Sequence, residues 1–108
     1  MAIEVEKISC VNSAAFVMEF KVKYADEDGN ELNADWSSGK YPVGQSRTCD
    51  LAELSHPIPE GAPIWIQVHA ILGKTKTSNT HKFFYKKNKQ SASFKVTGTT
   101  LNFSIHEL

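Results

Sequence analysis

Two aromatic-polar groups in the chain combine residue types that could do chemistry, and the first lies in residues 64–72. Trp65, Gln67 and His69 occupy alternate positions, and apolar residues take the others: Ile64, Ile66, Val68, Ala70 and Leu72. This period of two predicts a β-strand whose indole, amide and imidazole project from the face opposite the core. Such a row fits either a surface that stacks against a sugar or protein, or a hidden seam between sheets.

The second group lies in residues 36–45. Trp36 and Tyr41 are accompanied there by Ser37, Ser38 and Gln45. Aromatic rings stack on the apolar faces of sugars, while hydroxyl and amide groups bond to sugar hydroxyls. The predicted ligand-binding residues are Trp36, Tyr41, Trp65, Gln67 and His69. Packing inside a sandwich would explain the two tryptophans equally well.

An acidic stretch offers the ligands of a metal ion. Asp26, Asp28 and Asn30 alternate around Gly29, and hard oxygen ligands suit Ca²⁺. The glycine spacing and the flanking strand signals depart from an EF-hand loop. A hairpin turn with solubilising carboxylates is the alternative interpretation, and Ca²⁺ is the one cofactor that the sequence suggests.

Catalytic signatures are missing from the sequence. The four histidines lie in separate segments, with no HxH or HExxH spacing, and there is no GxSxG elbow or Walker loop. We therefore expect no enzymatic activity. The tract 82–89 mixes aromatics with lysines, but Phe83 and Tyr85 fall on the inward alternation, so we do not expect nucleic-acid binding. Cys10 and Cys49 are too few for a disulfide framework; buried free thiols are expected, and a single bridge is the alternative.

Strand signals separated by turn residues extend along the whole chain. Residues 16–24 alternate most cleanly, a phase slip near Lys7 suggests a β-bulge, and Leu101, Phe103 and Ile105 share one phase near the end. The pattern predicts an all-β fold, an antiparallel β-sandwich of about eight strands, jelly-roll or Ig-like. With 108 residues and 41% hydrophobic content, residues 1–108 are expected to form a single domain.

Charge is divided unevenly along the chain. Residues 1–60 hold eleven acids and five bases, a net charge of −6, and residues 61–108 hold seven lysines and one acid, a net charge of +6. The lysines from Lys74 to Lys89 would form a basic end suited to an anionic membrane surface, or simply a solvated set of loops. The N-terminal residues lack the pattern of a signal peptide, so we expect a cytoplasmic location or secretion by a non-classical route.

Three short stretches resemble a known group of proteins: residues 11–18, 38–46 and 97–102. They are similar to short single-domain β-sandwich lectin-like proteins, the slime-mould hemagglutinins and their microbial relatives. The resemblance implies surface recognition of carbohydrate, assisted by calcium or oligomerisation. The early Asn12-Ser13-Ala14-Ala15 before an apolar strand also resembles the opening of small membrane-active sandwich toxins, the aegerolysins.

These features predict a protein that binds rather than catalyses. The leading hypothesis is a lectin or hemagglutinin that binds a glycan or glycoprotein, as a homo-oligomer because repeated weak sites gain avidity. The first alternative is a membrane-binding or pore-forming sandwich that uses the lysine-rich end. The second is a protein-interaction or structural module.

Overall fold

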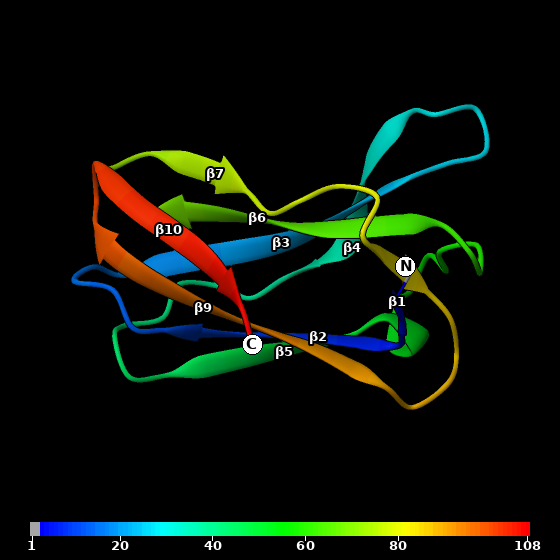
Figure 1. Ribbon diagram of the computed structural model, residues 1–108, viewed down its shortest axis with the longest axis horizontal. Coiled ribbons are helices and arrows are strands. Elements are labelled where there is room, and N and C mark those ends of the chain that lie inside the picture. Colours follow the sequence, from blue (N-terminus) through cyan, green and yellow to red (C-terminus); the bar gives the residue numbers. More distant parts are fainter. Residues whose placement is uncertain (1–2) are drawn as a thin grey trace.

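Alternating apolar residues form most of the strands that the sequence predicts, and these strands lie in two facing sheets (Figure 1). The structure is a computed structural model that describes residues 3–108. The predicted β-sandwich is confirmed. No helix in the described part of the chain has the length and apolar character needed to cross a membrane.

Each sheet draws strands from both halves of the sequence. The first sheet has the order β1 (Ile3–Val5), β8 (Phe83–Tyr85), β6 (Pro63–Ala70), β3 (Met18–Ala25) and β4 (Glu31–Ser37), with β7 (Thr75–Thr77) paired to β6. The second has the order β10 (Asn102–Glu107), β9 (Ser91–Thr99), β2 (Lys7–Asn12) and β5 (Ser46–Asp50). A single 3₁₀ turn, η1 (Leu51–Glu53), follows β5.

Both sheets are mixed, which corrects the expectation of purely antiparallel pairing. β1 pairs with β8 in parallel, and β2 pairs with β9 in parallel. Both parallel pairs join the start of the chain to its last third, so sequence neighbours could not reveal them. The described residues form ten strands rather than about eight, because the first predicted strand is divided near Lys7 into β1 and β2, and the short β7 is added.

The phase slip near Lys7 is a change of sheet and not the bulge that the sequence suggests. β1 ends at Val5 in the first sheet, and β2 begins at Lys7 in the second. Val5 and Ile8 both stay buried, because the chain crosses the sandwich between them and the inward face changes with the sheet.

The core lies between the sheets, as the strand alternation predicts. On β3 the side chains of Met18, Phe20 and Val22 are fully buried, and on β6 those of Ile64 and Val68 are too. The second sheet contributes further large side chains, which include Ile8, Phe94, Val96 and Phe103. Burial of such residues is the main stabilising contribution to a domain of this size.

The chain connections gather at two ends of the sandwich. We call residues 13–17, 38–45, 71–74 and 100–101 the tip; they join β2 to β3, β4 to β5, β6 to β7 and β9 to β10. In Figure 1 the tip lies at the left. The opposite end consists of residues 6, 26–30, 51–62 and 86–90. The N-terminal strand lies near this second end (Figure 1).

Candidate functional site

The tip carries most of the large apolar side chains that the sandwich leaves in solvent. Leu72 is 97% exposed, Leu101 66%, Val43 58% and Val17 41%. Each belongs to a different tip connection. A soluble domain rarely gathers apolar side chains at one place unless another surface covers them, so the tip is the leading candidate site.

Asn12 holds two of the tip connections together. It is the one buried polar residue in the described chain. Its side-chain amide donates to the carbonyls of Phe16 (2.7 Å) and Tyr41 (3.2 Å), and its Oδ1 accepts from the amide of Ala14 (2.9 Å). Its own carbonyl accepts from the amide of Gly44 (2.8 Å). Every polar group of this side chain is therefore used in fixing the loops that present Val17 and Val43.

The other two connections are bonded to each other. The amide of Lys74 donates to the carbonyl of Thr100 at 3.0 Å. A Cβ on Gly73 would meet that same carbonyl oxygen at 2.4 Å, so only glycine permits this approach. The amide of Ile71 donates to the carbonyl of Val17 at 3.0 Å and joins a third connection to the pair. Leu72 and Leu101 are thus presented by one bonded unit.

Leu72 stands in an unfavourable backbone conformation. Its φ is +64°, in the left-handed region that L-residues other than Gly, Asn and Asp seldom adopt. The turn is closed by the amide of Gly73, which donates to the carbonyl of Ala70 at 2.8 Å. The fold therefore keeps a strained apolar residue almost wholly in solvent, a combination that is typical of functional sites.

Trp65 faces away from the main core, as predicted, but it is not exposed. Its relative exposure is 2%, and the imidazole of His81 is stacked on it, with ring centroids 6.5 Å apart. After β7 the chain continues alongside β6, where the amide of Ser78 donates to the carbonyl of Ile66 at 2.9 Å, and it then reaches His81. The interpretation of Trp65 as part of an open ligand surface is therefore wrong.

Gln67 and His69 do line a depression, without an aromatic neighbour. It has a volume of about 200 Å³, and Glu19, Lys21 and Thr75 complete its walls. Nδ1 of His69 lies 2.8 Å from the hydroxyl of Thr75. Gln67 and His69 thus belong to a shallow polar recess, and they do not form the surface for stacking that the sequence suggests.

Trp36 and Tyr41 serve the interior. Trp36 packs against the core, with its ring centroid 5.0 Å from that of Phe20. Tyr41 is fully buried, and its hydroxyl donates to the carbonyl of Cys10 at 2.9 Å. The guanidinium of Arg47 lies 4.8 Å from the Tyr41 ring centroid. The structure therefore does not bring the five predicted ligand-binding residues into one site.

The candidate calcium residues build a hairpin turn. Oδ1 of Asp26 accepts from the amides of Asp28 (3.0 Å) and Asn30 (2.8 Å), and Oδ2 accepts from the side-chain amide of Asn30 at 3.3 Å. The backbone and side-chain bonds from Asn30 lower the pKa of Asp26. Within residues 3–108, no group of three His, Cys, Asp or Glu side chains could hold a metal ion. The alternative interpretation, a turn, describes this segment.

Both cysteines are buried free thiols on neighbouring strands. Burial raises the pKa of Cys10 and of Cys49 to about 12. Each thiol thus stays protonated at neutral pH, which makes it a poor nucleophile. The expectation of buried free thiols is confirmed.

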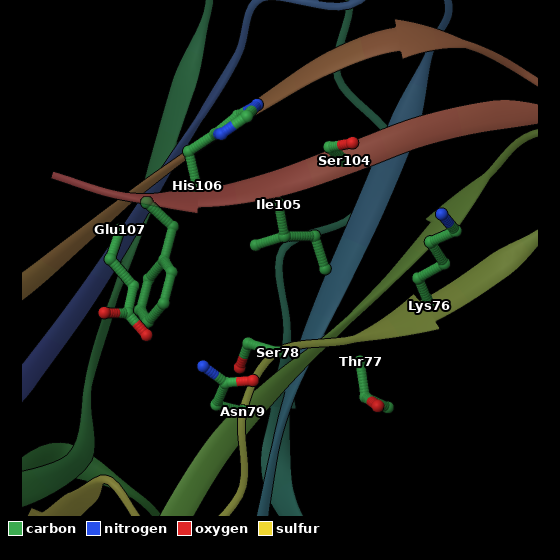
Figure 2. A pocket seen from close by; sticks show the side chains of 9 residues that line it. Lys76, Thr77, Ser78, Asn79, Ser104, Ile105, His106 and Glu107 are labelled. Carbon is green, nitrogen blue, oxygen red and sulfur yellow. The ribbon is translucent and has the colours of Figure 1, made fainter.

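A polar groove lies on the flank of the sandwich, between β10 and the segment that follows β7. Its volume is about 570 Å³, and Phe94 contributes to its lining. Figure 2 shows Ile105 of β10 and, across the gap, Ser78 and Asn79. Nζ of Lys76 donates to the carbonyl of Phe103 at 2.7 Å and joins the two walls. Sequence reasoning did not find this groove, because no motif joins its walls.

The lysines from Lys74 to Lys89 do not form one end, which corrects the sequence interpretation. Lys74 lies at the tip, whereas Lys87 and Lys89 lie at the opposite end, because β7 and β8 carry the chain along the sandwich between them. Lys82 forms an ion pair with Glu107. A run of like charges in sequence is therefore divided between two distant surfaces.

No protein-family model matches the sequence, and no curated protein matches it. Solved structures do match the fold. The membrane-binding domain of pneumolysin is 13% identical, with a TM-score of 0.51, and the match covers 94% of each chain. The chain therefore shares its β-sandwich fold with that domain.

Larger toxins contain the same fold. A Gram-negative toxin is 18% identical with a TM-score of 0.54, and pneumolysin described as a sugar-binding protein is 12% identical with a TM-score of 0.50. Each match covers 94% of this chain and 22% of the other, so the chain spans about a fifth of the length of those proteins. At these identities the similarity shows the fold alone.

Proposed function

We propose that this protein is a non-catalytic module that binds membrane surfaces through its tip. The observation that carries the proposal is the exposure of Leu72, Leu101 and Val43 at one end of the sandwich. Protruding apolar side chains gain free energy on entering the boundary between lipid headgroups and acyl chains. The membrane-binding domain of pneumolysin, which shares the fold, supports this assignment.

The structure of the tip suits insertion better than docking to a pocketed partner. Leu72 and Leu101 belong to one hydrogen-bonded unit, so both side chains can enter the membrane without rearrangement of the backbone. Rigid presentation reduces the ordering entropy lost on binding. Assembly into a homo-oligomer would multiply the number of tips on one membrane and raise the avidity.

The test is co-sedimentation with phospholipid vesicles. The double variant Leu72→Gln/Leu101→Gln should bind at least 100-fold more weakly, because each buried leucine contributes about 2 kcal/mol. Leu108→Gln is the matched control, since Leu108 is 72% exposed and lies outside the tip. Equal binding by the double variant and the wild type, with unchanged thermal unfolding, would overturn the proposal.

A second candidate function is carbohydrate recognition in the groove beside β10. The groove has the size of a small-ligand site. Asn79 and Ser78 offer an amide and a hydroxyl, opposite the apolar side chain of Ile105 (Figure 2). That combination suits the hydroxyls and the C–H face of a sugar. The description of a pneumolysin with this fold as a sugar-binding protein favours it.

A glycan array followed by titration calorimetry tests this second function. For a glycan found on the array, Asn79→Ala should weaken binding about tenfold, the loss of one or two hydrogen bonds. Gln67→Ala in the smaller recess should leave binding unchanged. Weaker binding by Gln67→Ala and unchanged binding by Asn79→Ala would instead place the sugar site in the recess beside β6. An array on which no glycan binds would overturn the carbohydrate-binding function.

A further inference from the structure

We propose that the tip selects anionic phospholipids, whose headgroups are held by Lys40 and Lys74. This inference rests on the membrane-binding function proposed above and adds the class of lipid. The tip residues 13–17, 38–45, 71–74 and 100–101 contain these two lysines and no acidic residue. Both lysines are exposed.

The two lysines stand beside the apolar side chains that enter the membrane. Lys74 is two residues from Leu72, and its backbone amide is bonded to the loop that carries Leu101. Lys40 is three residues from Val43. A lysine stem is long and flexible, so its ammonium can stay at the depth of the lipid phosphates while a neighbouring leucine reaches the acyl chains.

Three other lysines of the chain's basic half contact neighbouring groups away from the tip. Nζ of Lys76 donates to the carbonyl of Phe103 and lies 5.6 Å from that residue's ring centroid. Lys82 pairs with Glu107, and Nζ of Lys86 lies 3.9 Å from a carboxylate oxygen of Glu4. Lys87 and Lys89 lie at the opposite end and Lys95 lies within β9, so Lys74 is the lysine of residues 61–108 that is placed to meet a membrane bound at the tip.

The opposite end carries the reverse charge. Residues 6, 26–30, 51–62 and 86–90 hold six carboxylates and three lysines, a net charge of −3. The tip holds a net charge of +2. The protein is neutral overall, but this separation gives it a dipole that turns the tip toward an anionic surface and the acidic end away from it.

The experiment compares binding to neutral phosphatidylcholine vesicles with binding to vesicles that also contain phosphatidylserine. The wild type should bind the anionic vesicles more tightly, and added salt should remove the difference. Lys40→Gln/Lys74→Gln should lose about 25-fold on anionic vesicles, about fivefold for each lysine, and little on neutral ones. Lys87→Gln/Lys89→Gln, at the opposite end, is the matched control.

The failures of the two proposals are distinguishable. Equal wild-type binding to both kinds of vesicle would overturn the lipid selectivity and leave the membrane-binding function standing. A loss in Lys87→Gln/Lys89→Gln rather than Lys40→Gln/Lys74→Gln would also overturn the inference. Absence of binding to either kind of vesicle would overturn the membrane-binding function itself.

Discussion

At each end of the sandwich, hydrogen bonds from one polar side chain fix the connections, but the two ends expose side chains of opposite character. At the tip, the buried side chain of Asn12 holds two connections and exposes apolar residues around them. At the opposite end, the carboxylate of Asp26 closes a turn that exposes more carboxylates. Water solvates the carboxylates that are exposed at the Asp26 turn. The tip instead exposes apolar side chains, whose contact with water is unfavourable. The contrast supports the proposed membrane-binding role of the tip.

Removal of the Asn12 and Asp26 side chains should give the largest difference in protein stability between the two ends. Asn12→Ala leaves the carbonyl of Phe16 and the amide of Ala14 buried without partners, and we expect it to lower the free energy of unfolding by about 3 kcal/mol. Asp26→Ala should cost much less, because water replaces the carboxylate at an exposed turn. Urea unfolding measures both variants. Similar losses in the two would contradict the difference in how the ends are held.

Substitution of a glycine at each end by alanine should give the next largest difference in the free energy of unfolding. Gly73→Ala forces its Cβ against the backbone oxygen of Thr100, so we expect a loss of about 2 kcal/mol. Gly29→Ala has open space around it and only the strain of its φ of +81°, about 1 kcal/mol. A ranking in the reverse order, by the same unfolding assay, would show that the tip loops are not in close contact.

Leu72→Gly should stabilise the protein while weakening its binding. Glycine adopts the φ of +64° without penalty, so we expect a gain of about 0.5–1 kcal/mol in the free energy of unfolding. Loss of the side chain removes the most exposed apolar group of the tip. Thermal unfolding and vesicle co-sedimentation, measured on the same sample, should therefore move in opposite directions. A variant that is less stable, or that binds normally, would contradict the functional reading of Leu72.

The buried thiols should not react with thiol reagents until the protein unfolds. Because their folded pKa is about 12, against an ordinary value of 9.0, Cys10 and Cys49 stay protonated in the folded protein. A thiol reagent at neutral pH should react only in urea. The unfolded chain loses these protons first as pH rises, so this contribution to stability is present below pH 9 and is lost between pH 9 and about 12. Rapid labelling of the folded protein would contradict this burial.

Period-two alternation predicted the regular strands well and failed where they end. The inward residues of β3 and β6 are buried as expected. Leu72 and Leu101 continue the inward phase in the sequence, but both strand patterns are interrupted by turns, and the two leucines project into solvent. Gly73, directly after Leu72, is the one local signal that the phase would be lost.

The rest of the site depends on contacts between distant segments. The parallel pairing of β2 with β9 brings residues 13–17 beside residues 98–101, and no sequence motif records that pairing. Trp65 is a second example of this dependence. Alternation predicts correctly that its side chain lies on the sheet face opposite the core, but it cannot show that the segment carrying His81 covers that side chain. Side-chain direction is a local property, whereas exposure is set by the whole fold.

The orientation of the protein on a membrane tests the central claim most directly. Because the native thiols are buried, an environment-sensitive fluorophore can be attached to a single new cysteine, at Thr99→Cys beside the tip or at Glu27→Cys at the opposite end. With vesicles added, the tip label should show a blue-shifted, brighter emission and the Glu27→Cys label should not change. A shift at Glu27→Cys, or none at Thr99→Cys while the protein is bound, would contradict membrane binding through the tip.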